Sequence, residues 1–183
     1  VFPVLHSTDF TNWEYIGRAL TPVVAGAPSG AYWAPEVVER DGTFHMYFSV
    51  AGGDGDELHR LHVAVADHPA GPFRTVRRLL PEEGFTIDGH PFQDPADGRW
   101  YLFFSKDFFE GRVGTGIAVV PLADSMTAVE GPVTPILRPF ADWQIYERNR
   151  TIYGRLWDAW HTIEGAFVVH RSGRYRLFYS GGP

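Results

Sequence analysis

The stretch "DGTFHMYFS" (41–49) returns as "DGRWYLFFS" (97–105) and again as "SGRYRLFYS" (172–180). Each copy opens with a Gly that follows Asp or Ser, which is a turn signal, and continues with aromatic residues that alternate with smaller or polar ones. This pattern is typical of a β-strand that leaves a tight turn. One chain therefore contains the same turn and strand three times.

Other strand-like segments accompany each copy in a fixed order. Before the copies come "WAPEVVER" (33–40), "IDGHPFQDPA" (87–96) and "IEGAFVVHR" (163–171), and after the first two come "LHVAVAD" (61–67) and "TGIAVVPLAD" (115–124). The repeated glycines lie 56 and 75 residues apart, and self-similarity at such spacing indicates stacked supersecondary units. Because no helical pattern separates the strands, we expect an all-β fold. Blades of antiparallel sheet around an axis, a β-propeller, fit it better than a sandwich does.

The repeat also divides the chain, which we interpret as a single partial propeller domain over 1–183. Its expected parts are a blade end (1–24), a blade (25–80), a second blade (81–124), an insertion loop (125–160) and the start of the next blade (161–183). The insertion explains the longer second period; a short helix within it is the alternative to a long loop between blades. Roughly three to four blades are represented, so we expect the remaining blades to come from chain segments outside this sequence.

Composition narrows the classes of partner. The formal net charge is −6 and the basic residues are scattered. The sequence therefore has no cationic stripe of the kind that binds a phosphate backbone, and we do not expect nucleic acid as a partner. No apolar run is long enough to span a membrane, and the sequence shows no secretory signal pattern. The cellular compartment of the protein is therefore not assigned. With no cysteine, disulfides, thiolate catalysis and cysteine-ligated metals are excluded. The aromatic content of 15% suits the flat faces of sugars.

Counting residues back from each repeated Gly leads to an equivalent position at the start of the preceding strand. Trp33 lies nine residues before its Gly, Asp88 ten and Glu164 nine. Because the innermost strands of propeller blades converge on the axis, we expect these three side chains to share a central pocket. Two carboxyl groups and an indole suit the cleavage of a glycosidic bond, which needs a proton donor and a carboxylate that activates water or attacks directly. A neighbouring acid raises the pKa of the proton donor.

An ordered set of motifs over nearly the whole chain resembles glycoside hydrolase family 43. The motifs are "STDFTNWEYIG" (7–17), "WAPE" (33–36), "HVAVADHPAGPF" (62–73), "IDGHPFQDPADGRWYLFF" (87–104) and "WHTIEGAFVVHRSGRYRLFYSGG" (160–182). The resemblance implies a five-bladed propeller that hydrolyses α-L-arabinofuranosides or β-D-xylosides with inversion. It also implies three carboxyl groups: an Asp base, an Asp that tunes the acid and orients substrate, and a Glu acid.

Carried over by position, the resemblance makes Glu164 the general acid and Asp88 the residue that tunes its pKa. Trp33 would shape the sugar site, and His161 would lie near the same pocket and orient substrate or water. Gly89 and Ala166 depart from the family pattern, which often has Pro at both places.

The family's base Asp has no counterpart in this sequence. Asp67 and Asp124 follow their repeated glycines by 25 and 26 residues, so Asp9, at the equivalent outer turn, projects the base to roughly 25 residues before Val1. We therefore expect the base to lie upstream of this chain, and the family's later-blade Arg to lie beyond Pro183. On that reading the chain by itself is inactive.

We assign no catalytic or metal-binding role to the other acidic residues considered. Asp41, Asp94 and Asp97 fit turns, and the cluster of Asp54, Asp56 and Glu57 lacks the spacing of a calcium loop, so a solvated hairpin loop is the preferred interpretation. We assign no metal site and expect no cofactor; calcium is an alternative that the sequence does not support. Three further functional hypotheses stay open: a carbohydrate-binding propeller that has lost catalysis, a repeat scaffold for protein partners, and a transferase or other sugar-cleaving propeller with similar blades.

Overall fold

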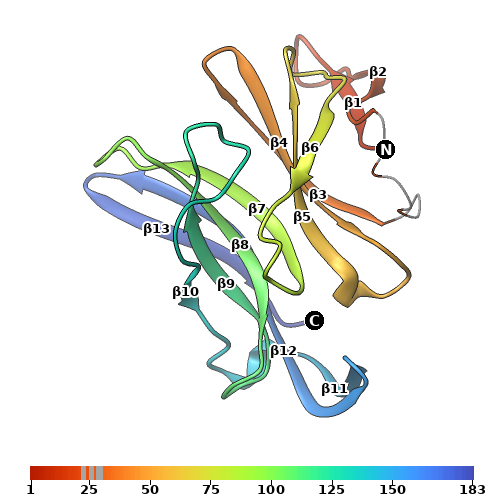
Figure 1. The fold of residues 1–183 in the computed structure, drawn as a ribbon, viewed down its shortest axis with the longest axis vertical. Helices are drawn as coiled ribbons and strands as arrows, with labels where there is room; N and C mark the ends of the chain where they lie inside the picture. The colour runs from red at the N-terminus through yellow and green to blue at the C-terminus, as the bar shows by residue number, and fades with distance from the viewer. Residues whose placement is uncertain (22–23, 25–26, 28–30) are drawn as a thin grey trace.

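The chain is built almost entirely from β-strands joined by turns (Figure 1). The computed structural model describes residues 1–21, 24, 27 and 31–183. Within these residues the strands are β1 (Pro3–His6), β2 (Glu14–Arg18), β3 (Tyr32–Arg40), β4 (Thr43–Ala51), β5 (His59–Ala66), β6 (Arg74–Arg78), β7 (Thr86–Gln93), β8 (Trp100–Phe108), β9 (Gly114–Pro121), β10 (Thr134–Leu137), β11 (Ile145–Ile152), β12 (Arg155–Arg171) and β13 (Arg174–Gly181). Two 3₁₀ helices, η1 (Asp56–Leu58) and η2 (Asp142–Gln144), interrupt them. The predicted all-β class is confirmed.

The strands form the blades that the repeat predicts. The first blade is the antiparallel sheet β3-β4-β5-β6, and the second runs β7-β8-β9-β10. The third begins with β12, which pairs with β13, and a short parallel pairing of β12 with β9 joins it to the second blade. Strands β4, β8 and β13 carry the three copies of the repeat and are the second strands of their blades. The expected boundary between 1–24 and 25–80 falls among residues outside the described part of the chain.

The predicted insertion loop over 125–160 is wrong, because about half of that segment lies in paired strands. Strand β10 completes the second blade by pairing with β9, so this blade extends well past residue 124. Strand β11 forms a hairpin with the first half of β12, which therefore begins at Arg155 and not near 161. Tyr153 and Gly154, with φ of 56° and 66°, make the two-residue turn of this hairpin. Tyr in place of Asn or Asp hid that turn in the sequence.

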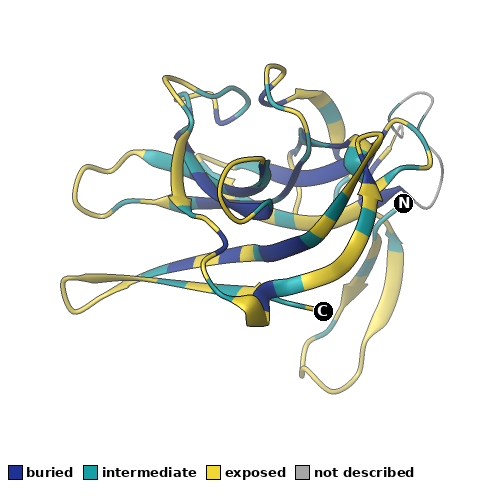
Figure 2. Cartoon of the chain, turned by 90° about the horizontal axis from the view of Figure 1, so that it is seen from below, coloured by how far each residue is buried: buried dark blue, intermediate teal, exposed yellow. Residues whose placement is uncertain are grey.

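A buried apolar layer lies between the first two blades. Tyr47, Leu61, Leu102 and Phe104, from β4, β5 and β8, are all fully buried in it. The Tyr47 hydroxyl donates to the carbonyl of Met126 at 2.7 Å, so the one polar group of that ring is satisfied. Figure 2 shows the buried residues concentrated in the central strands and the exposed ones in the hairpin ends. This packing fixes the angle between the blades and so places their innermost strands.

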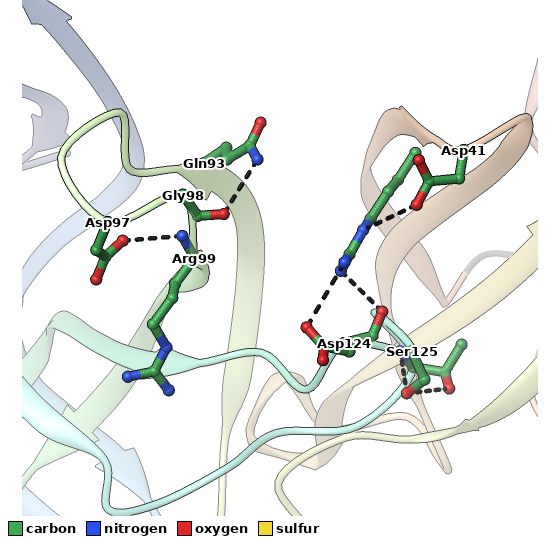
Figure 3. A network of polar contacts seen from close by, with 9 residues as sticks. Asp41, Gln93, Asp97, Gly98, Arg99, Asp124 and Ser125 are labelled. Atoms are coloured by element: carbon green, nitrogen blue, oxygen red, sulfur yellow. Dashed lines mark hydrogen bonds and ion pairs between the residues drawn. The ribbon is translucent and has the colours of Figure 1, made fainter.

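Two of the acidic residues assigned to turns, Asp41 and Asp97, lie in the turns that follow the innermost strands of the first and second blades (Figure 3). Asp41 has a φ of 52°, and the Asp97 carboxylate accepts from the backbone N–H of Arg99 at 2.8 Å. Arg40 forms an ion pair with its chain neighbour Asp41 at 3.4 Å and, between the two blades, one with Asp124 at 3.6 Å. The φ of Asp41 and the hydrogen bond to Asp97 agree with the prediction that these two aspartates shape turns. Neither helix in the described residues is long and apolar enough to cross a membrane.

Candidate functional site

The innermost strands β3, β7 and β12 share one irregularity at the blade entrance. Trp33, Ile87 and Glu164 pair with the last serine of the three repeats, and a one-residue bulge follows each of them. In the second blade, the position equivalent to Trp33 and Glu164 is therefore occupied by Ile87, and Asp88 is the next residue along the strand. The cause is the turn between β7 and β8, which is longer than the turns of the other two blades, so counting back from Gly98 stops one residue late.

The bulge places the next residue of each strand in the left-handed region. Ala34, Asp88 and Gly165 occupy equivalent positions with φ of 46°, 53° and 65°. Bulges of this kind redirect a side chain relative to the regular pleat. Asp tolerates a positive φ better than most residues that have a Cβ atom. The carboxyl of Asp88 thus leaves its strand from a different position than that of Glu164.

Asp88 and Glu164 nevertheless meet across the two blades. The backbone N–H of Gly165 donates to Asp88 Oδ2 at 3.1 Å, so Asp88 contacts the residue directly after Glu164. Burial raises the pKa of Glu164, and the negative charge of Asp88 raises it further. Burial also raises the pKa of Asp88, and the bond from Gly165 partly opposes this. A Glu that holds its proton beside a second acid is suited to act as a proton donor.

Glu164 and Trp33 line a cavity of about 180 Å³ at the blade entrances. The Trp33 side chain is 37% exposed, and one of its faces stacks on the His59 ring at a centroid distance of 3.4 Å. The wall opposite the first blade comes from the β11-β12 hairpin, which contributes Tyr146, Arg150, Ile152, Trp160 and Thr162. The pocket thus combines an acid with indole and phenol rings, as sugar sites require.

A hydrogen-bonded carboxyl group lies in the same cavity and was missed by sequence reasoning. Asp107 on β8 accepts from the Thr115 hydroxyl at 2.8 Å and from the Tyr153 hydroxyl at 2.6 Å. Burial raises the pKa of Asp107, whereas both hydrogen bonds oppose the shift. A signal was present, since Asp107 follows the repeat Ser105 by two residues and so lies on the same face of an extended strand.

A fixed cation at the cavity was missed as well. Arg150 forms ion pairs with Glu147 at 3.1 Å and with Asp56 at 3.8 Å. Its guanidinium lies 5.0 Å from the centroid of the Tyr146 ring. These contacts tie the β11-β12 hairpin to the loop between β4 and β5, so residues from two blades hold one wall of the cavity.

His161 does not lie in this cavity, contrary to the sequence expectation. Its Nδ1 donates to the carbonyl of Val113 at 3.1 Å, and its Nε2 lies 3.3 Å from Arg112 Nη1. His161 lines a different, open pocket, whereas its neighbour Thr162 lines the cavity with Glu164. Successive side chains of a strand point to opposite faces, and even numbers face the cavity here. His161 therefore leaves the set of candidate site residues.

The acidic loop has no cage of metal ligands in the described residues, where no group of three or more His, Asp or Glu side chains is arranged to hold an ion. Asp56 and Glu57 instead belong to η1 and line the cavity.

Comparisons with known proteins identify the family. The family model described as Glycosyl hydrolases family 43 matches residues 1–183. The non-reducing end alpha-L-arabinofuranosidase BoGH43B of Bacteroides ovatus is 30% identical over 118 residues, which are 61% of this chain and 18% of that protein. A putative beta-xylosidase of Xylanibacter ruminicola is 27% identical over 98% of this chain and 35% of its own length.

Solved structures match over the full length of the chain. A thermostable family-43 glycoside hydrolase has a TM-score of 0.76 and 28% identity, covering 99% of this chain and 56% of its own. An α-L-arabinanase of Cellvibrio cellulosa, solved with arabinohexaose, has a TM-score of 0.66 and 22% identity, covering 99% and 58%. The match thus spans little more than half of these two solved chains, and 35% or less of the two relatives named above. The repeated blades of the chain are those of a β-propeller, and the chain belongs to glycosyl hydrolases family 43.

Proposed function

We propose that the full-length protein hydrolyses arabinofuranosyl or xylosyl linkages of plant-type polysaccharides or oligosaccharides with inversion. The observation that carries the proposal is Glu164, a half-buried acid with a raised pKa, at a cavity shared with Trp33 and next to Asp88. The similar proteins described as an arabinofuranosidase and a beta-xylosidase support the choice of sugars.

In this mechanism the protonated Glu164 gives its proton to the departing glycosidic oxygen. Asp88, held by the N–H of Gly165, keeps the pKa of Glu164 high, so the proton is retained until the leaving oxygen needs it. Trp33 offers an apolar face to the sugar ring. A carboxylate from a chain segment outside 1–183 activates water on the opposite face, about 6.5–9.5 Å from Glu164, which is the separation that inversion requires.

Exposed apolar side chains support a ring completed by further blades. On β12 and β13, Phe167 and Phe178 are 53% and 56% exposed, and Trp13, beside β2, is 54% exposed. Large rings left open at the two ends of the described sheets are expected to pack against neighbouring blades. This part of the proposal concerns the full-length protein.

The test is a substrate screen of the full-length protein with aryl α-L-arabinofuranoside, aryl β-D-xyloside and arabino- and xylo-oligosaccharides. Proton NMR of the first product formed should show the anomer opposite to that of the substrate. Retention of configuration would contradict the mechanism. Tight sugar binding without turnover would instead favour a carbohydrate-binding propeller, and neither binding nor turnover would favour a scaffold for protein partners.

A further inference from the structure

A buried histidine joins the innermost strands of all three blades. His90 on β7 is 5% exposed. Its Nδ1 lies 2.6 Å from Glu36 Oε1 on β3, and its Nε2 accepts from the backbone N–H of Val168 on β12 at 3.1 Å. The Phe167 ring, on the same strand as Val168, lies 5.0 Å from the imidazole. One side chain thus reaches from the first blade to the third.

These two contacts determine which ring nitrogen of the imidazole carries the proton. The backbone N–H of Val168 is a donor only, so Nε2 has to offer its lone pair. The carboxylate of Glu36 accepts, so Nδ1 has to carry the proton. A doubly protonated ring would bring two N–H groups face to face at Nε2. The hydrogen bonds therefore select the neutral tautomer with the proton on Nδ1.

Among the described residues, the hydrogen bond from Val168 is one of two side-chain to backbone hydrogen bonds between β7 and β12. In the described part of the chain β7 exchanges ladder hydrogen bonds with β8, whereas β12 pairs with β9, β11 and β13. The two innermost strands are tied instead by side chains of β7 that accept from backbone N–H groups of β12. Asp88 accepts from Gly165, and His90 accepts from Val168. Glu164 lies on β12 directly before this tied stretch.

We propose that His90 is a positioning residue for the proton donor. As the neutral tautomer set by Glu36, it fixes β12 against β7 and so holds Glu164 at its place beside Asp88. The inference rests on the proposed function, because positioning matters only if Glu164 transfers a proton.

The kinetic test compares two leaving groups in the full-length protein. A glycoside with an activated leaving group such as dinitrophenol departs without protonation, whereas an oligosaccharide needs the general acid. For His90→Phe we expect kcat on the oligosaccharide to fall by about 10- to 100-fold at nearly constant KM, and kcat on the activated glycoside to change little. His90→Gln retains an acceptor for Val168 and should recover part of the loss.

The matched control is His45→Phe. His45 is also 5% exposed but lies on β4, outside the cavity. This variant should leave the ratio of the two rates unchanged. An equal loss on both substrates in His90→Phe, or no loss at all, would overturn the positioning role.

Nitrogen NMR of the unmodified protein gives a readout that needs no activity. Nδ1 of His90 should show the shift of a protonated nitrogen and Nε2 that of an unprotonated one. The amide of Val168 should exchange faster in His90→Phe than in the unmodified protein. A proton on Nε2 would refute the inference even if the glycosidase activity is found. Absence of turnover together with the expected tautomer would refute only the proposed function, leaving the tie between the strands intact.

Discussion

The innermost strands of the second and third blades have the same geometry but carry their acids at different places. Both strands have a one-residue bulge directly after the residue that pairs with the last serine of the repeat. In β7 the acid, Asp88, occupies the left-handed position of the bulge, whereas in β12 the acid, Glu164, precedes that position and Gly165 occupies it. The repeat therefore supplies one backbone frame. The position of the carboxyl within the frame decides whether it lines the cavity or supports the residue that does.

The largest effect should come from removing the acid that lines the cavity. For Glu164→Gln we expect kcat on oligosaccharides to fall by about 10²- to 10⁴-fold, because the amide cannot give a proton to the leaving oxygen. Steady-state kinetics of the full-length protein check this. Glu130→Gln, an exposed glutamate in the segment between β9 and β10, is the control and should keep full activity. Equal activity of the two variants would show that Glu164 is not the proton donor.

Removing the charge of Asp88 should lower activity by changing the pKa of Glu164. In Asp88→Asn the amide oxygen still accepts from Gly165, but the negative charge that raises the pKa of Glu164 is lost. The pKa of Glu164 should fall, so the alkaline limb of the pH profile of kcat should move to lower pH. Misplacement of the acid can lower kcat by up to about 100-fold in addition. An alkaline limb that stays in place would show that Asp88 does not tune Glu164.

Filling the left-handed position of β12 should cost stability and activity together. Gly165→Ala has room, since the nearest atom to an added Cβ is Ser180 Oγ at 3.8 Å, but its φ of 65° is strained for Ala. We expect a loss of about 1 kcal/mol in the free energy of unfolding and a lower kcat. Gly173→Ala, with a φ of 69° and open space in a distant turn, should lose similar stability and no activity. Denaturant unfolding and kinetics separate the two effects.

The smallest effect should come from a residue outside both strands. Tyr153→Phe removes one of the two hydrogen bonds that oppose the raised pKa of Asp107, so that pKa should rise further. A carboxyl whose pKa is raised by folding costs stability where it is ionised in the unfolded chain, which is above about pH 3.9. The variant should therefore lose roughly 0.5 to 1 kcal/mol at neutral pH and less at pH 3. Tyr101→Phe, which frees Asp97 in an exposed turn, should show no such dependence.

The sequence by itself determined the blades and their order. A turn glycine followed by residues of alternating character is a local signal. The sequence therefore predicted the strands that carry the repeats, the strands before them, and the placement of Trp33 and Glu164 at one cavity. The family resemblance rests on the same ordered motifs. These features depend on neighbours in the chain, and for that reason they survive in the one-dimensional pattern.

Only the tertiary structure decided what faces the cavity. The length of one turn moved Asp88 out of register with Glu164, a Tyr-Gly turn concealed the β11-β12 hairpin, and strand alternation turned His161 away. Asp107 and Arg150 reach the same cavity from segments far apart in the chain. The spacing from Ser105 indicated only the face of the strand on which Asp107 lies. Its approach to Arg150 depends on how the blades pack, which is set by contacts between residues distant in the chain.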